Sequence, residues 1–193
     1  MRWALLLAAL LMAGCAGAPA PTEDSRIGKT GHEHAVFRMF VQGQEVGFND
    51  ARFDYSNTRY SQAHMHFHGA ESTSAEYVIH AEGILGYRLR EFFDTLDVEV
   101  AKDHVRLNPE VHGSKEYVNG GGLAWQMWVD GCKDGPDNWA HVADWTEYRP
   151  FQHDRMLITY ASQSATPDSL AQELARVPSH ADLDASLNDA CGA

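Results

Sequence analysis

The chain has few basic residues, few cysteines and no long apolar run after its first residues. Fifteen lysines and arginines stand against 27 aspartates and glutamates, which gives a net charge of −12 with histidine neutral. Binding to nucleic acid needs a basic surface, so this charge argues against nucleic acid as a partner. The charge also disfavours docking on anionic lipid, and it is compatible with the attraction of cations.

Sequence motifs of nucleophilic and phosphate-binding enzymes are also missing. The chain contains no Gly-x-Ser-x-Gly, no His-Glu-x-x-His and no phosphate-binding loop. The run Gly120-Gly121-Gly122 is interpreted as a flexible loop rather than an anion cradle. These absences do not exclude an enzyme, but they favour a binding protein.

Apolar residues at the start of the chain predict an exported protein. Arg2 precedes the run from Trp3 to Met12, which is too short for a stable transmembrane helix and is typical of a signal peptide. The run ends in Leu11-Met12-Ala13-Gly14-Cys15, which resembles a bacterial lipobox. We expect a lipoprotein signal peptide over residues 1–15 with Cys15 lipidated, and ordinary cleavage after Ala16-Gly17-Ala18 is the alternative.

Small and polar residues over 16–31 predict a flexible tether. The protein would then be anchored to the cell envelope by lipid alone and would face the periplasm or the exterior. No later apolar run is long enough for a membrane span. The remaining chain is long enough for one sizeable domain, expected over residues 32–162, followed by a helical extension over residues 163–193.

Two cysteines remain after the signal, Cys132 and Cys191. In an oxidising compartment an even pair suggests a disulfide. The bond would close a loop of about 60 residues and contribute on the order of 4 kcal/mol in the chain-entropy model. One of the two cysteines as a metal ligand is the alternative.

Hydrophobic periodicity predicts several strands and one packed helix. Leu85, Leu89, Phe92, Phe93 and Leu96 fall at helical spacing and predict an amphipathic helix over residues 84–96. A second helix is expected from Thr166-Pro167-Asp168 to before Pro178, and a third from Ser179 to near Gly192. Strands are expected over residues 36–41, 45–48, 63–69, 76–82, 98–107, 123–129 and 155–160.

This order of elements predicts an α+β fold with a mixed or antiparallel sheet and C-terminal helices. A helix that follows two hairpins, with a late strand over residues 154–160, resembles the arrangement of β-grasp modules. Fold analogy alone does not define function.

Three histidines alternate with apolar residues in Ala63-His64-Met65-His66-Phe67-His68-Gly69. Period-two alternation predicts a half-buried strand whose successive side chains point to opposite faces. The odd positions of this strand and the next are apolar or aromatic and therefore face the core. In a hairpin, His80 of the second strand would lie opposite His64 or His66. The face away from the core would then carry four imidazoles together with Glu76 and Glu82.

Strand spacing limits how these imidazoles can share one ion. Residues two apart on a strand are separated by about 6.6 Å, so His64 and His68 lie about 13 Å apart and do not both bind one metal. The preferred ligand set is His66, His68 and His80, with His64 as a proton shuttle or part of a second site. His34, and with it His32 of the upstream His-x-His, could add nitrogens if their strand lies alongside.

The histidine segments also resemble known proteins. His32-Glu33-His34-Ala35, His66-Phe67-His68 and the segment from His80 to Tyr87 resemble a poorly characterised group of exported archaeal and bacterial proteins with HEHA and IHxHAxGxxLGxFF motifs. The resemblance covers roughly residues 31–160 and implies a secreted or tethered histidine-rich domain with no activity to carry over. The group often has His-x-His in its second segment, whereas Val78 stands at the first of these positions here.

A second likeness concerns ligand geometry alone. His-x-His on one strand with a histidine on its neighbour is similar to the zinc ligand arrangement of α-class carbonic anhydrases, whose other motifs are absent.

Three functions follow from the sequence. The preferred one is a lipid-anchored module that binds Cu²⁺ or Zn²⁺ through imidazole. The second is a zinc hydratase or hydrolase whose three histidines leave a position for water. The third is a metal-free structural or interaction domain. Met39 and Met65 are expected in the core, which does not favour a methionine-rich Cu(I) site.

Overall fold

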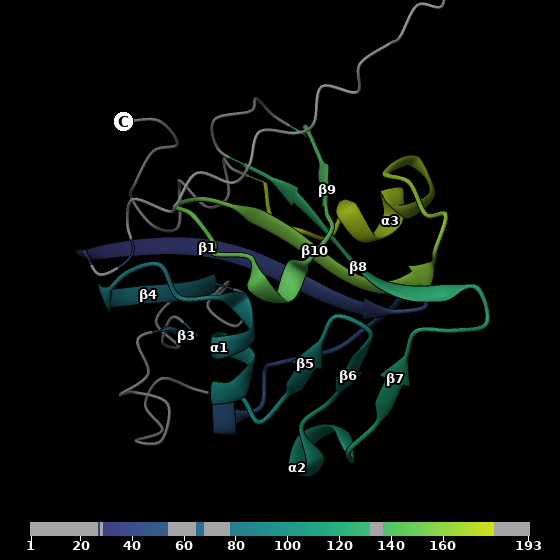
Figure 1. Cartoon of the computed structure of the whole chain (residues 1–193), viewed down its shortest axis with the longest axis horizontal. Coiled ribbons are helices and arrows are strands. Elements are labelled where there is room, and N and C mark those ends of the chain that lie inside the picture. The colour runs from purple at the N-terminus through teal and green to yellow at the C-terminus, as the bar shows by residue number, and fades with distance from the viewer. Residues whose placement is uncertain (1–26, 28, 54–64, 68–77, 132–136, 180–193) are drawn as a thin grey trace, which may run out of the picture.

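The computed structural model describes residues 27, 29–53, 65–67, 78–131 and 137–179, which form two β-sheets and a few short helices (Figure 1). The α-helices are α1 (Leu89–Thr95), α2 (Pro109–His112) and α3 (Ala171–Leu174), with short 3₁₀ turns at Ala51–Phe53, Trp145–Glu147 and Asp168–Leu170. The strands are β1 (Thr30–Val41), β2 (Gln44–Glu45), β3 (Met65–Phe67), β4 (Val78–Ile84), β5 (Glu99–Ala101), β6 (His104–Arg106), β7 (Glu116–Val118), β8 (Leu123–Asp130), β9 (Ala140–Val142) and β10 (Arg155–Ser162).

The larger sheet is mixed. Among the described strands its order is β3-β4-β1-β10-β8-β9, with β2 also paired to β1. The central strands β1 and β10 run parallel, and the other neighbours are antiparallel. The smaller sheet has the order β5-β6-β7. The α+β class expected from the sequence is thus confirmed.

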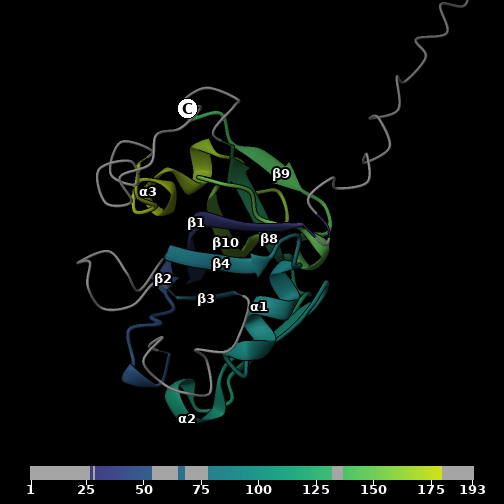
Figure 2. The same ribbon diagram turned by 90° about the vertical axis from the view of Figure 1, so that its left-hand side faces the viewer.

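One face of the larger sheet, here called the α1 face, carries the main core. Phe37 of β1 is fully buried and packs against the rings of Phe92 and Phe93 at centroid distances of 5.8 and 5.6 Å. Met65 and Phe67 of β3 and Ile79 of β4 are buried in the same cluster, as the alternation of the sequence predicts. Figure 2 shows α1 on this side of the sheet and α3 on the other.

The opposite face, here called the α3 face, has a smaller apolar cluster. Leu170, Leu174 and Val177 cover Val36 and Phe40 of β1, together with Val78, Trp128 and Leu157 from the neighbouring strands. The helical segment begins as the sequence predicts: the Thr166 and Ser169 side chains exchange hydrogen bonds with each other's backbone N–H groups. This segment covers part of the α3 face and so limits where that face can bind a ligand.

A buried arginine of the sheet forms an ion pair and also holds the segment around Pro178. Arg155 of β10 donates to the carboxylate of Asp130 on β8 at 2.7 Å, and both residues are buried. The Arg155 guanidinium also donates to the carbonyl oxygen of Pro178 at 2.7 Å and lies over the ring of Trp139. Because removal of one partner leaves a buried charge uncompensated, this contact is expected to be sensitive to substitution.

Helix α1 is shorter than its apolar pattern predicts. The helix begins at Leu89 rather than residue 84, because Gly86 adopts a φ of +86°, outside the helical range. The Glu91 carboxylate accepts the backbone N–H of Arg88 at 2.6 Å and caps the start. Leu85 is buried from the segment before the helix, so its helical spacing with Leu89 is coincidental.

Residues 98–107 form a hairpin rather than the single strand expected. Strands β5 and β6 pair across a turn at Lys102 and Asp103, and β7 pairs with β6. The alternation of this segment does not distinguish one long strand from two short ones joined by a polar turn. Helix α2 and strands β7 and β9 are short elements that the periodicity did not predict. The signal peptide, Cys15, Cys132, Cys191 and the third C-terminal helix lie outside the described residues.

The aromatic core of the α1 face predicts the effect of one deletion. Phe92 is fully buried against Phe37, Phe67 and Phe93. Phe92→Ala is expected to lower the free energy of unfolding by about 3–5 kcal/mol, measured by urea denaturation, because it removes apolar contacts and leaves a cavity. The matched control is Phe151→Ala, since Phe151 is 47% exposed and its loss should cost far less. Equal losses for the two variants would contradict this packing.

Candidate metal site

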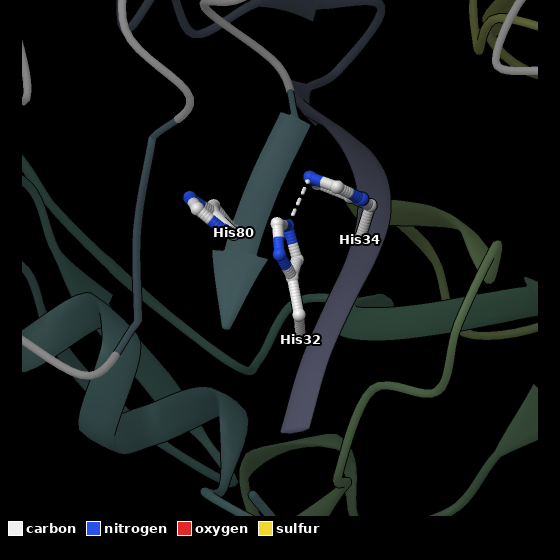
Figure 3. A group of neighbouring side chains, drawn as sticks. All are labelled: His32, His34 and His80. Atoms are coloured by element: carbon white, nitrogen blue, oxygen red, sulfur yellow. Dashed lines mark hydrogen bonds between the residues drawn. The ribbon is translucent and has the colours of Figure 1, made fainter. Parts of the chain in front are cut away.

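Three histidines from two neighbouring strands come together at one end of the α3 face (Figure 3). His32 and His34 lie on β1, and His80 lies on β4. One ring nitrogen from each lies within 4.8 Å of the other two. The ring centroids are 4.3–4.9 Å apart, and the His34 and His80 rings are stacked. This is the only group of three or more such side chains at metal-binding spacing within the described part of the chain.

The register of β1 and β4 brings these rings together. His34 is directly opposite His80, and His32 is opposite Glu82. Directly opposite residues on one face have Cβ atoms about 5 Å apart, and His32 lies two positions from His34 on that face. The four positions therefore form a square with three imidazoles and one carboxylate at its corners.

The spacing of the nitrogens suits a shared ion. The Nε2 atoms of His32 and His34 are 3.0 Å apart and share a hydrogen bond. Two nitrogens bound to one Zn²⁺ at about 2.0–2.1 Å would be about 3.3 Å apart in a tetrahedral site. The His80 nitrogen lies within 4.8 Å of this pair, so it has to move closer for all three nitrogens to bind one ion.

The three histidines differ in exposure. His34 is 7% exposed, His80 is partly buried and His32 is exposed. The cluster thus has a buried side at His34 and a side open to solvent at His32. An ion could enter from the His32 side and be held against the sheet.

The loop before β10 holds His34 in place. Strand β1 pairs with β10 only from Val36 onward. Beyond that point the His34 backbone N–H donates to the Gln152 side-chain oxygen at 2.7 Å, and the His153 N–H donates to the His34 carbonyl oxygen at 2.6 Å. The loop therefore continues the hydrogen bonding of the sheet edge and fixes the backbone that carries a candidate ligand.

The same loop has an unusual backbone conformation. His153 is fully buried and has a φ of +63°, in the left-handed region that costs a non-glycine residue about 1–3 kcal/mol. The neighbouring Asp154 carboxylate stabilises the turn, because it accepts the Tyr148 hydroxyl at 2.6 Å and the Phe151 N–H at 2.7 Å. Strain of this kind persists where the surroundings fix the backbone, here beside the histidine cluster.

The histidines singled out from the sequence have different outcomes. The structure brings His80, His34 and His32 together. His66 of β3 is opposite His80 in the register, which is one of the two pairings expected from the sequence. His64 and His68 lie outside the described residues. Met39 and Met65 are buried in the core cluster, away from the imidazoles.

The scattered histidines with described side chains have other contacts. His112 bonds through Nε2 to the carbonyl oxygen of Gly47 at 2.8 Å and packs on Phe48. His104 lies beside Asp103 and Glu99, and hydrogen bonds to these two carboxylates raise its pKa. His141 is exposed and packs against the ring of Trp128. None of these three belongs to the cluster.

The sequence contained a signal for the position of His32 and His34. Ala35, Phe37 and Met39 alternate with even-numbered residues, and continuing this alternation backward gives a strand that includes both histidines. Gln152 had no such signal, since its role depends on a contact with a residue 118 positions away.

Fold and site together define an α+β domain with three histidines close enough to bind a metal ion. Comparisons with protein-family models, curated proteins and solved structures find no match for this chain. Among the described helices, none is sufficiently long and apolar to cross a membrane.

The contact between Gln152 and His34 generates a prediction. Gln152→Leu removes the acceptor of the His34 N–H and is expected to weaken metal affinity by about 10- to 100-fold, as loss of a supporting contact around a ligand typically does. The affinity would be measured by competition with a chromophoric chelator. Gln163→Leu is the control, because Gln163 is exposed and lies in the loop after β10. Unchanged affinity in Gln152→Leu would exclude a positioning role for the Gln152 side chain.

Proposed function

We propose that the protein is an exported, lipid-anchored domain that binds Cu²⁺ or Zn²⁺. The observation that carries the proposal is the convergence of His32, His34 and His80 within 4.8 Å. Export and the lipid anchor rest on the apolar start of the chain and on Cys15. The resemblance to exported histidine-rich proteins supports export or tethering and carries no activity over. Storage, delivery or sensing of the metal would follow from such a site.

The donor chemistry favours a transition metal. Imidazole suits zinc and copper, and intrinsic affinity favours copper, although metal availability in the compartment can reverse that order. Cysteine ligands are absent from the described cluster, so soft thiolate binding is not part of the proposed site. The acidic net charge of −12 would attract cations toward the domain.

Proton displacement accompanies the proposed binding. The hydrogen bond between His32 Nε2 and His34 Nε2 places a proton between two nitrogens that would both bind the ion. An imidazole binds a metal only in its neutral form, so protons compete with the ion for these nitrogens. Affinity should therefore fall as the solution becomes acidic.

His66 of the neighbouring strand, a preferred ligand from the sequence, is proposed as an alternative to one of the three clustered histidines. His66 on β3 is opposite His80 on β4, which in turn is opposite His34 on β1, so the three residues form one row across three strands. His68 and His64 remain proposed as further ligands or as a proton shuttle on the basis of the sequence alternation alone.

A zinc hydratase or hydrolase is the second candidate. The observation that favours it is that the cluster supplies three nitrogens and that His32 is exposed to solvent, as in a zinc site that keeps a position for water. Zinc bound in this way lowers the pKa of its water to about 7. Zinc-dependent CO₂ hydration that disappears in His80→Ala would establish this activity.

The primary experiment is metal titration of the purified, chelator-treated full chain by isothermal calorimetry. About one equivalent of Zn²⁺ or Cu²⁺ should bind, and His80→Ala should weaken affinity by more than the roughly 10- to 100-fold that loss of a supporting residue costs. The matched control is His141→Ala, since His141 is exposed and lies outside the cluster. Absence of binding above a denatured control would reject the metal function and favour a metal-free domain.

A further inference from the structure

Glu82 occupies the fourth corner of the histidine square. The residue is opposite His32 in the register of β1 and β4, and two positions after His80 on the same face of β4. Its Oε2 atom is 3.9 Å from His80 Nε2. Two donors bound to one Zn²⁺ lie about 3.3 Å apart in a tetrahedral site, so the carboxylate is close to ligand spacing from His80. Its oxygens are not within 4.8 Å of all three imidazole nitrogens, so the side chain has to turn toward the cluster to complete the donor set.

The surroundings leave this carboxylate able to turn toward an ion. The Glu82 side chain is 60% exposed, and among the described residues no lysine or arginine forms an ion pair with it. An arginine partner, such as Arg155 is for Asp130, would compete with a metal for the Glu82 carboxylate. Rotation of the exposed side chain costs little compared with movement of a buried one.

We infer that Glu82 is the fourth ligand of the proposed metal site, which would make the donor set three imidazoles and one carboxylate. This inference rests on the proposed metal function. A carboxylate reduces the charge of a bound divalent ion from +2 to +1, which matters because the His34 side of the cluster is buried. The hard oxygen donor favours Zn²⁺ or Cu²⁺ over Cu(I), which prefers soft sulfur ligands.

The number of protein ligands distinguishes a site that only holds a metal from a catalytic site. Zinc sites that only hold the ion have four protein ligands, whereas catalytic sites have three and keep a position for water. With Glu82 bound, the ion has no position for water in a tetrahedral site. The site is therefore one that stores or transfers a divalent ion.

The test compares the full-length chain with Glu82→Gln, which keeps the size of the side chain and removes its charge. Glu116→Gln is the control, because Glu116 is exposed on β7 in the smaller sheet. Zn²⁺ affinity should fall at least about 10-fold in Glu82→Gln and remain unchanged in the control. Bound Co²⁺, used as a coloured substitute for Zn²⁺, should change its visible spectrum in Glu82→Gln only.

Added azide separates a closed site from an open one. The Co²⁺ spectrum of the unchanged chain should not respond to azide, and that of Glu82→Gln should respond because a position has opened. Equal Zn²⁺ affinities and spectra for the two chains would overturn the role of Glu82 while leaving the metal function in place. An azide response in the unchanged chain would also overturn it and favour the hydratase. Absence of metal binding in every variant would instead reject the proposed function itself.

Discussion

The antiparallel pairing of β1 with β4 is the interaction on which both the core and the histidine cluster depend. Its register places His34 opposite His80 and Ala35 opposite Ile79. Because side chains alternate along a strand, one register directs Ala35 and Ile79 to the α1 face and the imidazoles to the α3 face. A slip by one residue would exchange the two sets, so the burial of the core also determines the spacing of the histidines.

The α3 face is divided by the different lengths of its strands. Where β1 lies beside β10, the face is apolar and is covered by Leu170, Leu174 and Val177. Before Val36, β1 extends beyond β10, and this part carries His32 and His34. The second half of β1 thus belongs to the hydrophobic centre of the domain, and its first half carries the histidines. The position of the site follows from where β10 begins.

Much of the local structure could be predicted from the sequence. Strands around β1, β4, β8 and β10 follow from alternation or from apolar runs, because burial of one or both faces leaves that pattern. The start of α1 could not be predicted, since the apolar spacing continues back to Leu85. The conformation of Gly86 keeps the residues before it out of the helix. Short elements such as β9 and α2 carry too few residues for a period to be recognised.

The candidate site shows where prediction from sequence stops. The face occupied by His80 could be predicted, because its neighbours Ile79 and Ala81 mark the core side. Its pairing with His34, 46 positions earlier, could not, because the register between distant strands depends on how the whole sheet packs. The same holds for Gln152, whose bond to His34 spans 118 positions and leaves no local pattern.

The hydrogen bonds between the His34 backbone and the 152–153 segment couple this candidate metal-binding residue to a strained turn. The His153 amide donates to His34, and the Phe151 amide donates to Asp154 in the same turn. A ligand that binds the folded state alone stabilises every contact whose opening would disrupt the site. Occupancy of the histidine cluster would therefore slow amide hydrogen exchange in this turn, so the turn would act as a local reporter of whether the site is filled.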